Sequence, residues 1–175
     1  MIKYNGKIKI FIDSSSISEI KKYRKKYKIS GITTNPSIMK NDEVKNYFSH
    51  CKKISKTFKS IPVSFEILSD DFNEIYTQSI KINSISSNVY VKIPIVNSTG
   101  KSNLKIIRKL LDLKIKINVT AILDKKQIYK LNEIVTSQDK VIISIFAGRI
   151  ADTLRNPNSY IIYAKKLFKN KKNSK

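Results

Sequence analysis

The sequence predicts an α/β protein, specifically a parallel (β/α) barrel of TIM type. Short runs rich in β-branched residues alternate six times with longer amphipathic segments along the 175 residues. Such alternation produces parallel strands joined by right-handed crossovers. An open doubly wound sheet shares this pattern, but a nucleotide-binding sheet of that type has a glycine-rich first turn. Here the first turn is DSSS and the whole chain has four glycines, which favours the barrel.

Six strands and six helices are expected from these patterns. The strands are KIKIFID (7–13), SGITT (30–34), IPVSFEIL (61–68), VYVKIPI (89–95), KIKINVT (114–120) and KVIISIFA (140–147). Apolar residues at helical spacing predict helices over 16–28, 44–59, 71–85, 100–114 and 124–135, with a last helix whose first turn holds Pro157. Ser16 and Glu19 form a capping-box pattern at the first of these helices.

The number of strands is smaller than in a complete barrel, which has eight β/α units and about 250 residues. About six of the eight units are recognisable, and FKNKKNSK is too polar to be a buried strand. We therefore expect one incomplete barrel domain over residues 1–170, truncated at its C-terminus, and a basic tail over 171–175.

Composition excludes several classes of protein. The formal net charge is +22, but the excess is almost wholly lysine spread along the chain, and no nucleic-acid-binding motif accompanies it, so nucleic-acid binding is not favoured. No apolar run is long enough to span a membrane, and no secretory signal is recognisable. With one cysteine, Cys51, and one histidine, His50, a metal site is poorly supported. We expect a cytoplasmic protein with no metal, no cofactor and no membrane partner.

Polar or ionisable side chains lie at or near the carboxyl end of every expected strand. They are Asp13, Asn35, Glu66, Lys92, Thr120 and Ser144, with Arg149 just beyond the last strand. Each has an ordinary explanation of its own, such as a helix cap, a turn or an exposed charge. Lys92 alone could be a lysine that protects an edge strand from aggregation. Because barrel active sites are built at the carboxyl ends of the strands, their joint occurrence favours a catalytic site.

This set of residues suits imine chemistry. Loss of hydration inside an apolar barrel favours the neutral, nucleophilic amine of a lysine, which can attack a ketone and form an imine. Glu66 and Thr120 could then move protons through a water, and Asp13 could act as the base in carbon–carbon cleavage. In the same scheme Asn35 could bind a sugar hydroxyl and Arg149 a phosphate.

The same residues resemble the transaldolase family, in particular the small transaldolase and fructose-6-phosphate aldolase group. The motifs are FIDSS, GITTNPSIM, VSFEIL, VYVKIPI, INVTAI and ISIFAGRIAD, which follow one another from about residue 8 to residue 153. The resemblance implies a cofactor-free barrel that transfers a dihydroxyacetone unit between sugar phosphates of the pentose phosphate pathway through a Schiff base. It assigns the imine to Lys92, acid/base catalysis to Asp13, water positioning to Glu66 and Thr120, and substrate contacts to Asn35, Ser144, Phe146 and Arg149.

Two alternatives remain beside the transferase. Aldolase members of the group usually have tyrosine where this chain has Phe146 and glutamine near Glu66, so the resemblance favours a transaldolase over a fructose-6-phosphate aldolase-type lyase. An inactive, truncated relative that self-associates is the other alternative. The expected partners are sugar-phosphate substrates, and the oligomeric state stays open, with a homo-oligomer as one outcome.

Overall fold

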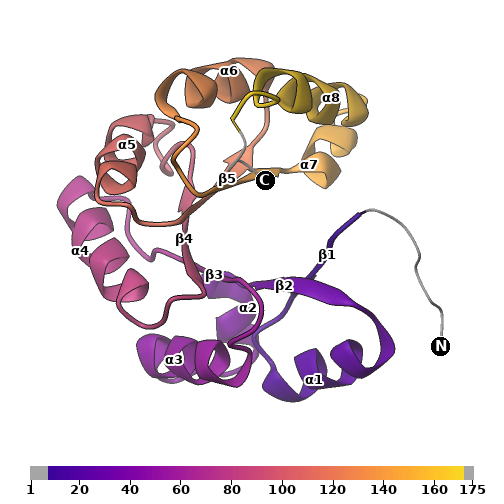
Figure 1. Ribbon diagram of the computed structural model, residues 1–175, viewed down its shortest axis with the longest axis vertical. Coiled ribbons are helices and arrows are strands. Elements are labelled where there is room, and N and C mark those ends of the chain that lie inside the picture. The colour runs from indigo at the N-terminus through magenta and orange to yellow at the C-terminus, as the bar shows by residue number, and fades with distance from the viewer. Residues whose placement is uncertain (1–7, 172–175) are drawn as a thin grey trace. The chain divides into compact units, whose positions relative to one another are not determined.

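The computed structural model describes residues 8–171, which contain six strands and eight helices (Figure 1). In chain order these are β1 (Ile10–Asp13), α1 (Ile17–Lys26), β2 (Ile29–Thr33), α2 (Pro36–Asn41), α3 (Tyr47–Thr57), β3 (Val63–Glu66), α4 (Phe72–Asn83), β4 (Val89–Pro94), α5 (Leu104–Asp112), β5 (Ile117–Ile122), α6 (Lys125–Ile134), β6 (Val141–Ile145), α7 (Ala147–Asp152) and α8 (Asn158–Leu167).

The six strands form one parallel sheet whose spatial order equals their order in the chain, β1 to β6. A doubly wound sheet reverses its strand order at a switch point, whereas a barrel adds each strand beside the previous one. The sequential order therefore confirms the predicted fold class, a partial (β/α) barrel of TIM type.

All six predicted strands and six predicted helices are present, with ends that differ by a few residues. The sequence missed α2 and α7, which have six residues each and are too short to show a helical repeat. At α1 the Ser16 hydroxyl accepts a hydrogen bond from the backbone N–H of Glu19, as expected. The Glu19 carboxylate, however, accepts from the Ser14 hydroxyl, so the full capping box is found instead at α6, between Asp124 and Gln127.

The chain divides into two compact units. Unit 1 comprises the residues up to Leu68 together with Gln78–Val91, and unit 2 comprises Ser69–Thr77 together with the residues from Lys92 onward. The single barrel domain over 1–170 stays a prediction. The predicted basic tail lies outside the described residues from position 172 onward. Among the described residues no helix combines the length and the apolar character that crossing a bilayer requires.

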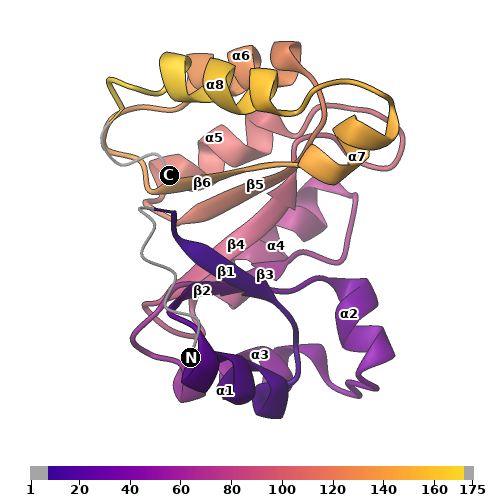
Figure 2. The same cartoon turned by 90° about the vertical axis from the view of Figure 1, so that its right-hand side faces the viewer.

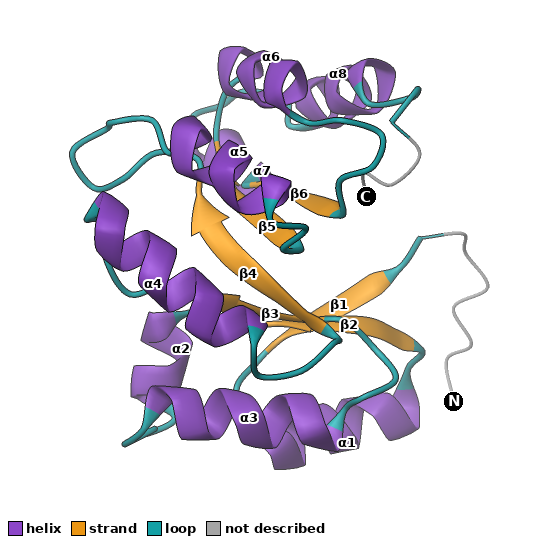
Figure 3. Ribbon diagram, turned by 60° about the vertical axis from the view of Figure 1, so that its left-hand side comes forward, coloured by secondary structure: helices purple, strands orange, loops and turns teal. Residues whose placement is uncertain are grey.

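In unit 1, α1 and α3 lie on the same side of β1 to β3 (Figure 2 and Figure 3). Ile20 of α1 and Ile54 of α3 are fully buried, as are Val63 and Phe65 of β3. The side-chain amide of Asn88, which precedes β4, donates to the backbone carbonyl of Phe58 at 3.0 Å. That bond satisfies a carbonyl at the C-terminus of α3, where the helix itself supplies no partner.

In unit 2, α5, α6 and α8 pack beside β5 and β6, and α6 contacts α8 directly (Figure 1). The buried face of α5 consists of Ile106, Ile107, Leu110 and Leu111. The strands supply Ile117, Val119 and Val141 to the same core. These aliphatic side chains lie at alternate strand positions, so the intervening residues of β5 and β6 face the other side of the sheet.

An ion pair connects α5 to the loop before β6. Arg108 Nη1 lies 2.7 Å from Asp139 Oδ2, and the Asp139 side chain is 2% exposed. The same carboxylate accepts from the backbone N–H and the hydroxyl of Thr136 at 2.8 and 2.9 Å. Burial raises the pKa of Asp139, but the hydrogen bonds from Arg108 and Thr136 outweigh it and hold the pKa below the ordinary 3.8.

We predict that Asp139→Asn lowers the free energy of unfolding by about 2 kcal/mol at pH 7, because the amide keeps the shape but loses charge-assisted bonds. Since the pKa of Asp139 is lowered by folding, its contribution is complete above pH 3.8 and is lost as the pH falls further. Urea denaturation at pH 7 and pH 3 measures both effects. If the difference in free energy of unfolding between wild type and variant is as large at pH 3 as at pH 7, the proposed contribution of the Asp139 charge is wrong.

Candidate active site

The predicted site residues of unit 1 lie at the carboxyl ends of β1 and β3 and just beyond β2. Asp13 is the last residue of β1, and its register partner on β2 is Thr33. The Thr33 hydroxyl donates to Asp13 Oδ1 at 2.9 Å, which fixes one oxygen of the carboxylate. Sequence analysis did not select Thr33, although it lies within the GITTNPS motif.

Asn35 is the N-cap of α2. Its Oδ1 atom accepts from the backbone N–H of Ile38 at 2.9 Å, and Pro36 occupies the first helical position. The ordinary explanation of Asn35 from the sequence is a turn residue before Pro36, and the structure shows instead that its oxygen caps α2. The cap orients the side chain so that the amide nitrogen is the end that can donate to a ligand.

Glu66 ends β3 and is half-buried. Its backbone carbonyl accepts a hydrogen bond from the hydroxyl of Tyr47, the first residue of α3. Burial, together with the neighbouring Cys51, raises the pKa of Tyr47 and keeps the phenol protonated as a donor. Two residues beyond Glu66, the backbone N–H of Leu68 donates to the side chain of Gln78 on α4 at 2.7 Å. Side chains from two helices thus hold the turn that contains Glu66.

The interior of α3 also contains the lone cysteine. Cys51 is fully buried, and burial raises the pKa of its thiol to about 12. A hydrogen bond with Tyr47 partly opposes that rise. At neutral pH the residue is a protonated thiol and not a nucleophile.

In unit 2, Lys92 is buried in β4, with 7% of its surface exposed. Val91 and Ile93, on either side of it, are fully buried and face the opposite way. The sheet places a strand on each side of β4, so the interpretation of Lys92 as a guard on an edge strand is wrong. A buried lysine on a central strand requires another explanation.

Thr120 on β5 is 1% exposed, and its hydroxyl has no hydrogen-bond partner within residues 8–171. Its carbonyl accepts from the backbone N–H of Ile95, the residue after β4. The next residue, Ala121, has φ 58°, and the register between β5 and β6 shifts between Val119 and Ile122. Such bulges redirect side chains and occur often beside active sites. Sequence patterns did not indicate this bulge.

The remaining predicted residues follow β6. Ser144 donates from Oγ to Asn118 Oδ1 on β5 at 2.7 Å, so these two side chains share the face opposite the helices. Phe146 is 37% exposed and precedes α7. Arg149 on α7 is exposed and lies 3.6 Å from Asp152. Asn118 is fully buried and was not selected from the sequence, where it looked like part of a strand.

The predicted site residues are divided between the two units. Unit 1 contains Asp13, Asn35 and Glu66, and unit 2 contains Lys92, Thr120, Ser144, Phe146 and Arg149. Unit 2 contains β4 from Lys92 onward together with β5 and β6, and these strands are consecutive neighbours in the sheet. No group of three or more His, Cys, Asp or Glu side chains suited to a metal ion occurs in the described part of the chain.

Comparison with known proteins identifies the family. The sequence model described as transaldolase/fructose-6-phosphate aldolase matches residues 10–174, nearly the whole chain. The chain belongs to this family. The resemblance inferred from the strand motifs is thereby confirmed.

Several curated transaldolase relatives align with this chain. A probable transaldolase of Thermodesulfovibrio yellowstonii is 34% identical over 145 residues, which cover 83% of this chain and 63% of the relative. Probable transaldolases of Nitrosopumilus maritimus and Thermoplasma volcanium are each 30% identical, cover 93% of this chain, and are themselves covered to 69% and 70%. This transaldolase-family chain thus spans roughly two thirds of the length of these relatives.

The Tyr47 contact can be tested within unit 1. We predict that Tyr47→Phe lowers the free energy of unfolding by about 1 kcal/mol, because the carbonyl of Glu66 loses its donor. Tyr129→Phe is the matched control, since Tyr129 is exposed on α6, and it should change stability by less than about 0.5 kcal/mol. Equal effects of the two substitutions, measured by urea denaturation, would show that the Tyr47 hydroxyl contributes nothing specific.

Proposed function

We propose that this chain is a transaldolase-type transferase that moves a dihydroxyacetone unit between sugar phosphates through an imine on Lys92. The observation that carries the proposal is a lysine buried between fully buried aliphatic neighbours on β4, in a chain that belongs to the transaldolase family. The proposal assigns the reaction to pentose phosphate metabolism in the cytoplasm and requires neither metal nor cofactor.

The first step is attack of the Lys92 amine on the ketone carbon of a ketose phosphate. Loss of water from the resulting carbinolamine leaves an imine whose positive nitrogen accepts the electron pair of the adjacent carbon–carbon bond when that bond breaks. The burial of Lys92, which leaves 7% of its surface exposed, supports this role because it limits the access of bulk water to the imine.

Cleavage also needs a base, and we assign it to Asp13. The carboxylate takes the proton from the substrate hydroxyl as that oxygen becomes an aldehyde, and the bond electrons move to the imine. The hydrogen bond from Thr33 to Oδ1 holds the carboxylate in one orientation and leaves Oδ2 as the oxygen suited to accept the proton. Thr33 is therefore proposed as the residue that positions this base.

Loss and re-entry of water at the imine need a proton carrier. We assign the positioning of that water to Glu66 and Thr120. The hydroxyl of Thr120 supports this role because it is buried and has no partner among residues 8–171. A buried polar group of this kind is costly unless a water or ligand satisfies it.

The substrate contacts are assigned to four further residues. The amide nitrogen of Asn35 can donate to a sugar hydroxyl, since its oxygen is used as a helix cap. Arg149 is exposed, and its 3.6 Å separation from Asp152 is too long for a hydrogen bond, so a phosphate can compete for the guanidinium. Ser144 and Phe146 complete the proposed set.

Trapping with borohydride tests the imine. Incubation with fructose 6-phosphate and borohydride should add one reduced, substrate-derived adduct to the chain, located on Lys92 by peptide mass spectrometry. Lys92→Met removes the amine and should give no adduct, whereas Lys101→Met, an exposed lysine after β4, should react as wild type does. One of the probable transaldolases is the positive control. Absence of an adduct under conditions that trap that relative would refute the proposal.

The dependence of turnover on an aldose-phosphate acceptor distinguishes a transaldolase from a fructose-6-phosphate aldolase-type lyase. With fructose 6-phosphate alone, a transferase should release the aldose phosphate only up to one equivalent per chain, because the dihydroxyacetone unit stays on Lys92. Added aldose-phosphate acceptor should then support repeated turnover. Steady release of free dihydroxyacetone without an acceptor would identify the chain as a lyase instead, against the expectation from Glu66 and Phe146.

A further inference from the structure

The turn that follows Asp13 is fixed by contacts from outside β1. Asp13 is the exposed last residue of this strand, and β1 is the end strand of the sheet within residues 8–171, so only β2 pairs with it there. The backbone N–H of Ser14 donates to the carbonyl of Thr33 at 3.0 Å, which extends the pairing by one residue. Beyond this point the sheet no longer determines the path of the chain.

Ser15 is held by side chains from two helices. It is fully buried, and its hydroxyl donates to a carboxylate oxygen of Asp42, the C-cap of α2. Its backbone carbonyl lies 2.8 Å from Nε2 of His50 on α3. A carbonyl can only accept a hydrogen bond, so Nε2 carries the proton and donates it. The hydroxyl and the carbonyl of Ser15 are thereby bonded to residues 27 and 35 positions away in the sequence.

Ser14 stabilises the turn from within. Its hydroxyl donates to the Glu19 carboxylate and accepts from the backbone N–H of Ser16 at 3.1 Å. Serine hydroxyls commonly bond to nearby backbone groups in turns that precede helices. These local bonds set the shape of the turn, whereas the bonds of Ser15 to His50 and Asp42 set its position against the helices.

Asp42 also connects this turn to Asn35. The two residues cap the opposite ends of α2. A helix of six residues is too short to be stable alone, so α2 depends on its end contacts and on the buried side chain of Met39. The hydrogen bond between Ser15 and Asp42 therefore connects the helix that follows Asn35 to the turn that follows β1.

We propose that His50 and Asp42 are positioning residues that fix the turn at 14–16 and thereby hold Asp13 in place for carbon–carbon cleavage. Through α2, Asp42 holds Asn35 as well. This inference rests on the proposed function, in which Asp13 is the base and Asn35 a substrate contact. Both positioning residues act through Ser15 and not by contact with the substrate. A displacement of about 1 Å at a catalytic group can cost roughly 100-fold in rate, so a loosened turn should slow cleavage.

Amide hydrogen exchange, measured by NMR on the ¹⁵N-labelled chain, tests the turn independently of activity. His50→Leu and Asp42→Leu each remove one hydrogen bond to Ser15, so exchange at the Ser14 N–H should become about fivefold faster. The N–H of Ile32 in β2, which is also hydrogen-bonded, should keep its wild-type rate. His50→Gln keeps a donor and Asp42→Asn keeps an acceptor, so both should retain slow exchange at Ser14.

Single-turnover kinetics tests the effect on cleavage. With the chain in excess over fructose 6-phosphate, His50→Leu should release the aldose phosphate about fivefold more slowly, and His50→Gln at nearly the wild-type rate. Borohydride trapping of dihydroxyacetone on Lys92 should be unchanged in both, because no carbon–carbon bond breaks in that reaction. Asp42→Leu should slow cleavage and also raise the half-saturating concentration about threefold, since it loosens the helix that Asn35 caps.

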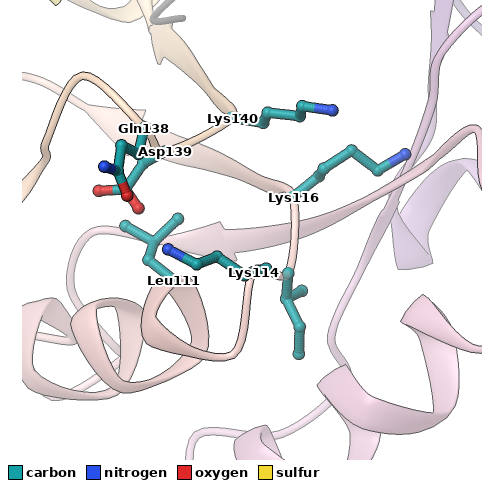
Figure 4. A pocket seen from close by; sticks show the side chains of 7 residues that line it. Leu111, Lys114, Lys116, Gln138, Asp139 and Lys140 are labelled. Atoms are coloured by element: carbon teal, nitrogen blue, oxygen red, sulfur yellow. The ribbon is translucent and has the colours of Figure 1, made fainter.

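Gln138→Leu is the matched control. Gln138 is exposed and lines a pocket at the amino ends of β5 and β6 in unit 2 (Figure 4), whereas the proposed catalytic residues of that unit lie toward the carboxyl ends of their strands. The substitution should change exchange at Ser14 and the rate of cleavage by less than about twofold.

Three results would overturn the inference. They are unchanged exchange at Ser14 in His50→Leu and Asp42→Leu, equal acceleration at Ser14 and Ile32, which indicates a general loss of stability, and a wild-type rate of cleavage in both variants. A wild-type chain that gives no borohydride adduct would instead refute the proposed function, and the exchange rates would then decide whether His50 and Asp42 fix the turn.

Discussion

Burial of β4 is the constraint on which the rest of the arrangement depends. Val89, Val91 and Ile93 are fully buried, and because side chains alternate across a strand, Lys92 must lie on the opposite face. Lys92 is itself 7% exposed, so the opposite face of β4 is also largely shielded from water, and burial of a lysine there calls for a specific role. The same alternation on β5 separates Ile117 and Val119 from Asn118 and Thr120. One face of each strand therefore stabilises the fold, and the other holds the polar side chains that we propose for catalysis.

Much of this organisation follows from sequence patterns that extend over many residues. The strands and the longer helices are visible because a repeat of two or about 3.6 residues persists long enough to be recognised. The position of polar residues at strand ends then follows from topology, since parallel strands present their carboxyl ends at the same edge. These two arguments led to the selection of Lys92 and Thr120, and the structure adds that both are buried.

Features set by single contacts could not be predicted in this way. The helices α2 and α7 have six residues each, fewer than two turns, and so show no repeat. Thr33 was passed over because threonine is common in strands, and only the register with Asp13 gives its hydroxyl a partner. The bulge at Ala121 depends on the fit between β5 and β6, which propensity does not encode. Tyr47 contacts a backbone atom of Glu66, and sequence patterns contain no information on such a pair.

The buried thiol of Cys51 can be used to measure local opening of the structure around α3. A thiol with a pKa near 12 inside the packed face of α3 cannot react with alkylating reagents while the helix is in place. Alkylation of Cys51 therefore occurs only when this part of unit 1 opens. Because the chain contains a single cysteine, no other thiol contributes to the measured labelling. The rate of labelling therefore measures how often α3 separates from β3, a quantity that belongs to local opening rather than to average structure.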